Sequence, residues 1–241
     1  MSSAFFGLNK MNVFEGLIEI ITTKSYILTV LEGLKLTLLI TVCALIIGLV
    51  LGMILAVVKI MAINIKGMKF PAKICDIYIA VIRGTPVALQ LFLMAFAIFA
   101  IRGFPLELTA ILTFGLNSAA YVAENIRAGI LSIDKGQTEA GRALGLGYGV
   151  TMSRIVVPQA IKNIIPTIGN EIIALLKETS IVSMVGLIDL TFAAKIIGAG
   201  QNMASYIVPM LFVAIFYLVL VYLITLVINY IERRLRASDK R

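Results

Sequence analysis

The chain alternates long hydrophobic runs that contain few charges with short polar segments. Five runs are long enough to cross a bilayer as α-helices, because about 20 apolar residues span its hydrocarbon core. They cover residues 36–58, 77–101, 106–129, 161–184 and 207–231. The pattern predicts an all-α integral membrane protein with about five transmembrane helices.

The segments outside these runs have distinct patterns. Residues 1–30 mix apolar and charged side chains, which predicts an extracytoplasmic or interfacial segment on the membrane surface. We expect Pro71 to end a helix, a kink at 84–86, a loop over 189–200 and a polar tail over 237–241. The GxxxG pair Gly48 and Gly52 is a weak signal that helices approach closely.

The positions of the basic residues predict the orientation. The chain is 60% hydrophobic with a net charge of +8, and its Lys and Arg gather between the hydrophobic runs. The three basic clusters lie at 59–73, 135–162 and 233–241, whereas the alternate loops carry only Arg102 and Lys195. Basic loops stay in the cytoplasm. The N-terminus is therefore expected outside, the C-terminus inside, and the basic charge indicates topology rather than a nucleic-acid partner.

The sequence lacks the residues that several kinds of catalysis and ligand binding require. The chain has no histidine, which excludes Ser-His and zinc-His catalysis by this chain alone. Cys43 and Cys75 have no CxxC spacing, so we expect no metal site. No GxxxxGK[ST] pattern is present, so the usual phosphate loop for ATP is absent from the sequence.

Glu124, Glu171, Lys177 and Glu178 interrupt the third and fourth runs and predict that these are inner helices, whereas the first and last spans have no charge in their middles and should face lipid. A charge deep in a bilayer costs roughly 2.5–3.5 kcal/mol or more, so it usually faces another helix or an aqueous path. Lys177, Glu178, Thr179 and Ser180 offer both signs of charge and two hydroxyls, which an amino acid zwitterion would match. Two interpretations stay open for this cluster, a lining of the transport path and a buried ion pair between helices.

The third run carries a second polar group. Ser118, Tyr121 and Glu124 follow one another at i, i+3 spacing and should share a helix face, and Asn117 lies beside them. Glu124 is either a path residue or an interfacial charge near the cytoplasm.

Residues 134–154 form the one long polar interruption, which we expect in the cytoplasm. Residues 137–144 predict a short helix that Gly145 and Gly147 end. The segment resembles the EAA loop of permease subunits of bacterial ABC importers. Glu139-Ala140, Gly145, Ile155 and Pro158 match that pattern, whereas Gly141 replaces its second Ala and Val157 its Leu.

Other stretches resemble the polar-amino-acid branch of the same family. They are Arg83-Gly84-Thr85-Pro86 with Gln90-Leu91-Phe92, Tyr121-Val122-Ala123-Glu124 with Arg127-Ala128-Gly129-Ile130, Pro158-Gln159-Ala160, and Lys177-Glu178-Thr179-Ser180. The resemblance covers 31–236 as one permease domain, with a coupling segment at 134–158. Glu178 departs from the Asp or Asn common there.

The resemblance implies a type I ABC importer permease fold in the cytoplasmic membrane and a multi-subunit complex. Two permease subunits, identical or paralogous, would pair in the lipid. Each would contact a subunit of an ATPase dimer that binds ATP and Mg, while an extracytoplasmic binding protein delivers the amino acid. This chain would be no enzyme and would bind no cofactor.

The resemblance also assigns two residue sets. The substrate path would include Lys177, Glu178, Thr179, Ser180, Glu124, Tyr121, Ser118, Asn117 and Gln90. The contact with the ATPase would include Glu139, Ala140, Gly141, Ala143, Leu144, Gly145, Ile155 and Pro158.

Three alternatives remain. The first is a permease for another small solute. The second is an intramembrane enzyme with Glu124 and Glu178 as acid and base, and the third a secondary transporter, for which the expected internal repeat is not visible. Two Glu near the path indicate a cationic amino acid, although glutamine and glutamate carriers share this scaffold.

Cysteine labelling tests the orientation. A cysteine at position 241 should react only with reagent on the cytoplasmic side, and one at position 2 only with reagent outside. Labelling of both termini from one side would contradict five spans.

Overall fold

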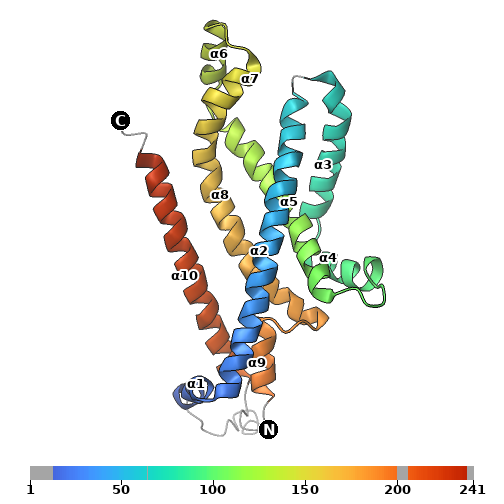
Figure 1. Ribbon diagram of the computed structural model, residues 1–241, viewed down its shortest axis with the longest axis vertical. Helices are drawn as coiled ribbons and strands as arrows, with labels where there is room; N and C mark the ends of the chain where they lie inside the picture. The colour runs from blue at the N-terminus through green and yellow to red at the C-terminus, as the bar shows by residue number, and fades with distance from the viewer. Residues whose placement is uncertain (1–12, 64, 200–205, 238–241) are drawn as a thin grey trace, which may run out of the picture.

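A computed structural model describes residues 13–63, 65–199 and 206–237, and it contains helices and no strands in these ranges (Figure 1). The α-helices are α1 (Val13–Thr22), α2 (Lys24–Met61), α3 (Lys69–Arg83), α4 (Val87–Leu93), α5 (Leu106–Leu131), α6 (Lys135–Ala143), α7 (Tyr148–Thr151), α8 (Val157–Glu178), α9 (Leu190–Gly198) and α10 (Ile207–Ala237). Short 3₁₀ turns η1 (Lys66–Met68) and η4 (Thr179–Val185), and π-helical turns η2 (Met94–Ile98) and η3 (Met152–Val156), extend some of them.

The described helices provide the expected number of membrane crossings. Three single helices, α2, α5 and α10, are long and apolar enough to span a bilayer. Two bent pairs, Lys66–Arg83 with Val87–Ile98 and Tyr148–Val185 with Leu190–Gly198, raise the count to five if each pair is one span. Helices α6 and α7 lie at one end of the bundle and α1 and α9 at the other, and α10 runs toward the α6–α7 end (Figure 1).

The first span is longer than predicted. Helix α2 has 38 residues and begins at Lys24, inside the segment predicted to lie on the membrane surface. At 1.5 Å per residue it is about 57 Å long, well beyond a hydrocarbon core of about 30 Å. The charges of Glu32 and Lys35 therefore lie within the helix near one end, and they do not stop it. Residues 1–12 lie outside the described part of the chain.

The second span is broken at 84–86, where a kink was predicted, and the break is much sharper than a kink within one continuous helix. Its two halves meet at 102° across Gly84–Pro86. Pro86 has no N–H to donate to a preceding turn, so the break falls there. Pro71 was predicted to end a helix, but it lies in the first turn of α3, where a missing N–H needs no partner.

The segment predicted as a loop over 189–200 contains helix α9. The Asp189 carboxylate accepts hydrogen bonds from the backbone N–H of Thr191 at 3.0 Å and of Phe192 at 2.9 Å. An Asp in this position satisfies the first N–H groups of a helix and so starts it. Position 200 lies outside the described residues.

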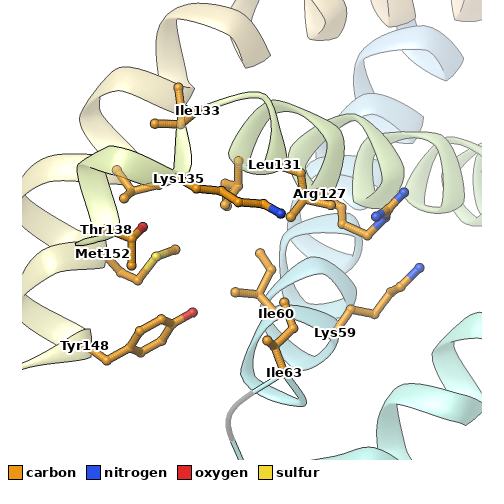
Figure 2. Close-up of a pocket in the computed structure, with 12 residues that line it drawn as sticks. Lys59, Ile60, Ile63, Arg127, Leu131, Ile133, Lys135, Thr138, Tyr148 and Met152 are labelled. Atoms are coloured by element: carbon orange, nitrogen blue, oxygen red, sulfur yellow. The ribbon is translucent and has the colours of Figure 1, made fainter. Parts of the chain in front are cut away.

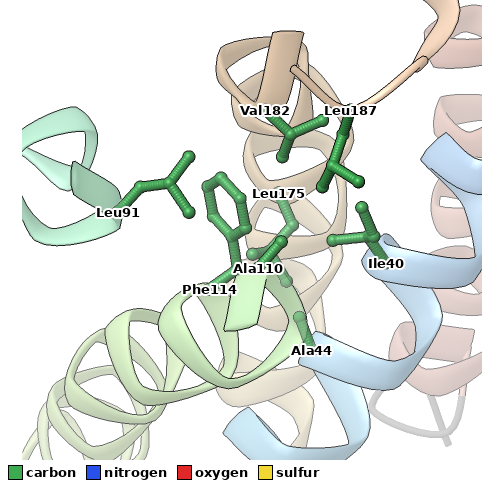
Figure 3. Packing of buried hydrophobic residues seen from close by; sticks show 8 residues of the cluster. All are labelled: Ile40, Ala44, Leu91, Ala110, Phe114, Leu175, Val182 and Leu187. Carbon is green, nitrogen blue, oxygen red and sulfur yellow. The ribbon is translucent and has the colours of Figure 1, made fainter. Parts of the chain in front are cut away.

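The central core surrounds Phe114 of α5, which is fully buried (Figure 3). Its neighbours come from α2, α4, α5 itself, α8 and the segments that follow α8: Ile40, Ala44, Leu91, Ala110, Leu175, Val182 and Leu187. Of the most hydrophobic stretch of α5, 61% is buried, compared with 6% for α10. This confirms that the third span is an inner helix and the last an outer one.

Helices α2 and α5 are in close contact through glycine. A Cβ at Gly48 would lie 2.6 Å from Ser118 Oγ, and one at Gly52 would lie 2.7 Å from Val122 Cβ and 2.9 Å from the carbonyl oxygen of Ala119. The GxxxG pair therefore does permit close approach, as its spacing suggested.

Replacing Gly52 with leucine should separate the two helices and destabilise the protein. Overpacking of this kind typically costs about 1–3 kcal/mol, which a lower melting temperature of the detergent-solubilised protein would report. Val50→Leu, at an exposed position of the same helix, is the control and should melt like the parent. Equal melting of Gly52→Leu and the parent would contradict the contact.

Candidate functional site

A polar cavity of about 380 Å³ lies between α5 and α8. Its volume is within the range of about 300–1,000 Å³ that small-molecule sites occupy. The lining residues are Asn117, Tyr121, Asn125, Thr167, Asn170, Glu171, Ala174 and Glu178.

Helical spacing brings these residues together. Positions 117, 121 and 125 recur every four residues on α5, and positions 167, 171, 174 and 178 recur at intervals of three or four on α8. Each set occupies one face of its helix. Gly169, between these positions on α8, packs against Ile228 of α10, where a Cβ would lie 2.7 Å away.

The charge of the cavity is negative. Two of the eight lining residues are carboxylates and none is basic. Glu171 is only 9% exposed, and Glu178 is partly buried. A carboxylate that loses water needs a cation or hydrogen-bond donors in its place. The cavity is therefore suited to a ligand that carries positive charge.

Gln90 connects this cavity to the broken span. Its amide N–H₂ group donates to the carbonyl oxygen of Ile82 and to Thr85 Oγ1, each at 2.8 Å. Its amide oxygen accepts from the amide of Asn117 at 2.9 Å. The side chain thus satisfies backbone freed by the break and fixes a residue of the cavity wall.

The broken span also contacts Tyr121, another residue of the cavity wall. The guanidinium of Arg83, the last residue of α3, lies 5.1 Å from the centre of the Tyr121 ring. That distance is within the range of a cation–π contact. The end of α3 therefore contacts the cavity wall directly.

Glu124 lies outside the cavity lining, in an ion-pair network. It is paired with Arg127 of its own helix and lies 3.6 Å from Lys59 Nζ of α2, which is 2.9 Å from the Asp76 carboxylate of α3. The network joins α2, α3 and α5. This arrangement matches the interfacial interpretation of Glu124.

The other predicted path residues fall into two groups, those that line or contact the cavity and those that lie outside it. Asn117, Tyr121 and Glu178 line the cavity and Gln90 contacts it through Asn117. Ser118 is fully buried against Gly48. Lys177 is exposed and outside the lining, and the hydroxyls of Thr179 and Ser180 donate to the carbonyl oxygens of Leu176 and Lys177, each at 2.7 Å.

Sequence reasoning missed several lining residues. Asn125, Thr167 and Asn170 were not proposed, and Glu171 was recognised as an inner charge without being assigned to the path. The signal that could have found those on the fourth run is the spacing of its polar residues, which places them on one helix face.

The segment predicted to form a short helix over 137–144 does so, as α6. The Asp134 carboxylate accepts from the backbone N–H of Gly136 at 2.7 Å and caps the start. Gly145, with φ of +75°, ends the helix in the left-handed conformation that favours glycine. Gly141 is buried against Thr151, where a Cβ would lie 2.7 Å from Thr151 Cγ2, so the methyl group of an alanine has no room here.

The other residues of the predicted contact set lie mostly on the surface. Leu144 is 78% exposed. Glu139, Ala140 and Ala143 are exposed beside it, Pro158 is exposed at the start of α8, and Ile155 is partly buried. In the described ranges no group of three or more Cys, Asp or Glu is arranged to hold a metal ion.

Comparison with known proteins identifies the family. Residues 48–237 match the family described as the binding-protein-dependent transport system inner membrane component. The arginine transport system permease protein ArtQ of Bacillus subtilis is 42% identical over 212 residues, 87% of this chain and 94% of that protein. The putative glutamine transport system permease protein GlnP of Rickettsia bellii is 40% identical over 88% of this chain and 95% of its own length.

Comparison with solved structures gives a result consistent with this family. A chain of an amino acid ABC transporter crystallised with histidines superposes with a TM-score of 0.80 at 37% identity, covering 90% of this chain and 98% of that one. The inward-facing methionine transporter MetNI shares the fold, with a TM-score of 0.72 at 20% identity over 88% of this chain and 99% of its own. The chain therefore belongs to the family of inner-membrane components of binding-protein-dependent transport systems, as a permease subunit of an amino acid ABC importer.

Proposed function

We propose that the cavity between α5 and α8 is the translocation site for a cationic amino acid. The observation that carries this proposal is that Glu171 and Glu178 face one cavity whose lining contains no basic residue. An amino acid with a basic side chain has two positive groups, which two carboxylates match in number. The amides and hydroxyls that line the same cavity can donate to the substrate carboxylate. The relative named for arginine and the structure determined with histidines are consistent with such a substrate.

A neutral amino acid such as glutamine is the second candidate. Three asparagines line the cavity, and an amide side chain can both donate to and accept from a substrate amide. A relative named for glutamine supports this possibility. The two candidates differ in their need for both carboxylates.

Neutralising the carboxylates should separate the two. Glu171→Gln and Glu178→Gln should each lower the uptake of arginine about tenfold or more, because a hydrogen bond to a charged group contributes about 1.5–3 kcal/mol. Uptake is measured with labelled amino acid in liposomes that contain the permease, its ATPase and its binding protein.

Glu107→Gln is the matched control, because Glu107 is exposed in the first turn of α5, outside the cavity. It should leave uptake unchanged. Unchanged arginine uptake by both cavity variants would refute the cationic site, and glutamine uptake by the parent that survives either single substitution would favour the second candidate.

The exposed face of α6 is the proposed contact with the ATPase. It projects from the bundle at the α6–α7 end (Figure 1), which we place in the cytoplasm within a coupling segment at 134–158. The ATPase dimer would bind ATP and Mg. The opposite end would receive the amino-acid-binding protein, and a second permease copy or paralogue would pair with this one. ATP-driven movement would then reach the cavity through α6 and the spans it joins.

Replacing Gly145 with valine should uncouple ATP hydrolysis from uptake. A side chain at this left-handed residue costs about 1–2 kcal/mol, and it would displace the end of α6. The measurement is the number of ATP molecules hydrolysed per amino acid transported by the purified complex.

Two further variants complete this test. Gly149→Ala, where a Cβ meets no neighbouring atom within 4 Å, should couple normally. Leu144→Asp places a charge on the exposed tip without backbone strain, and should weaken co-purification of the ATPase. Normal coupling and normal co-purification in both Gly145→Val and Leu144→Asp would disprove the docking role.

A further inference from the structure

A second pocket, of about 330 Å³, lies between the coupling segment and the adjacent ends of α2 and α5 (Figure 2). It shares no residue with the cavity between α5 and α8. Apolar side chains form most of its wall: Ile60 and Ile63 from the end of α2, Ile130 and Leu131 from α5, and Met152 and Val156 from η3. One side of the pocket therefore belongs to the spans and the other to the segment that follows α6.

The polar residues of this pocket are all hydrogen-bond donors. Lys59, Arg127 and Lys135 are basic, Thr138 and Tyr148 carry hydroxyls, and no carboxylate is in the lining. In Figure 2 the Lys135 side chain extends past Leu131, and the Tyr148 hydroxyl is directed across the opening.

Lys135 is the basic residue of this pocket without a carboxylate partner. The charges of Lys59 and Arg127 are offset by Asp76 and Glu124. The described part of the chain places no carboxylate within 4.0 Å of Lys135. The pocket therefore combines an apolar interior with one positive charge that has no carboxylate within 4.0 Å among the described residues.

We propose that this pocket binds an anionic phospholipid of the adjoining leaflet. The lipid phosphate would accept hydrogen bonds from Lys135 and Tyr148, and an acyl chain would lie along Ile60 and Ile63. A free anion would not account for the apolar wall, and a lipid without net charge would not account for Lys135. Ile63 is 66% exposed and Leu131 57% exposed at its edge, so the apolar side of the pocket is open at the surface, where an acyl chain could enter.

The location gives such a lipid a role in coupling. Its headgroup would contact the first turn of α6 through Lys135 and its acyl chain would contact the end of α2. A lipid held there would join the coupling segment to the spans, so its presence would affect how movement of α6 reaches the bundle. The charge of that leaflet would thereby influence transport.

The absence of tryptophan from this chain provides a direct test. In Ile63→Trp the introduced indole is the only one in the protein, and lipids brominated on their acyl chains quench it on contact. The full-length variant is reconstituted with brominated phosphatidylglycerol or brominated phosphatidylcholine. Quenching should favour the anionic lipid about fivefold, as expected for one basic side chain near a headgroup with net negative charge, because the choline cation of phosphatidylcholine offsets its phosphate. Leu218→Trp, on the outer helix α10 and 68% exposed, is the control and should show no preference.

Charge removal completes the test. Lys135→Ala in the Ile63→Trp background should abolish the preference and Lys135→Arg should keep it. Lys66→Ala, a basic residue outside the pocket, should not alter it. Inorganic phosphate should not relieve the quenching. Equal quenching by both lipids at position 63, or full relief by phosphate, would overturn the proposal. Because this readout needs no transport, it is independent of which amino acid is carried.

Discussion

The requirement that backbone polar groups find partners inside a membrane governs this structure, and Gln90 meets it at the point of greatest irregularity. A helix broken through 102° in the middle of a span exposes carbonyl groups that lipid cannot satisfy. The Gln90 amide donates to one of them, on Ile82, and to the Thr85 hydroxyl. Its oxygen remains available for Asn117. The break and the cavity are therefore supported by the same side chain.

Close packing by glycine lets a polar helix occupy the centre of the bundle. Gly48 and Gly52 allow α2 to lie directly against α5, so one face of α5 is covered by backbone and small side chains. The face with Asn117, Tyr121 and Asn125 is left for the cavity. The cost of placing amides and carboxylates at membrane depth is reduced because they face one another rather than lipid.

Periodic and compositional signals predicted much of this arrangement. The hydrophobic runs predicted the spans, and the glycines after residue 144 predicted the end of α6. The orientation expected from the basic clusters stays a prediction. Three features were wrong. Helix α2 continues past Glu32 and Lys35, Pro71 lies in the first turn of α3 rather than ending a helix, and Asp189 caps a helix where a loop was expected. In the last two, local chemistry at a helix start explains the difference, since a proline needs no N–H partner there and an Asp carboxylate accepts from the first N–H groups. The cavity was found only in part, since Glu178 was grouped with its sequence neighbours Lys177, Thr179 and Ser180, which lie outside the lining.

The length of α2 has a mechanical consequence. It is a continuous rod that lines the pocket beside α6 at its Met61 end and contacts α9 within its other half, where Thr37 Oγ1 accepts from the Leu190 N–H at 3.2 Å. Its closest contact with α5, at Gly48, divides it unequally, into arms of about 20 Å toward Met61 and about 36 Å toward Lys24 at 1.5 Å per residue. The two arms are therefore in a ratio of nearly two. A rigid tilt of α2 about Gly48 would move its Lys24 end almost twice as far as its Met61 end, and in the opposite direction.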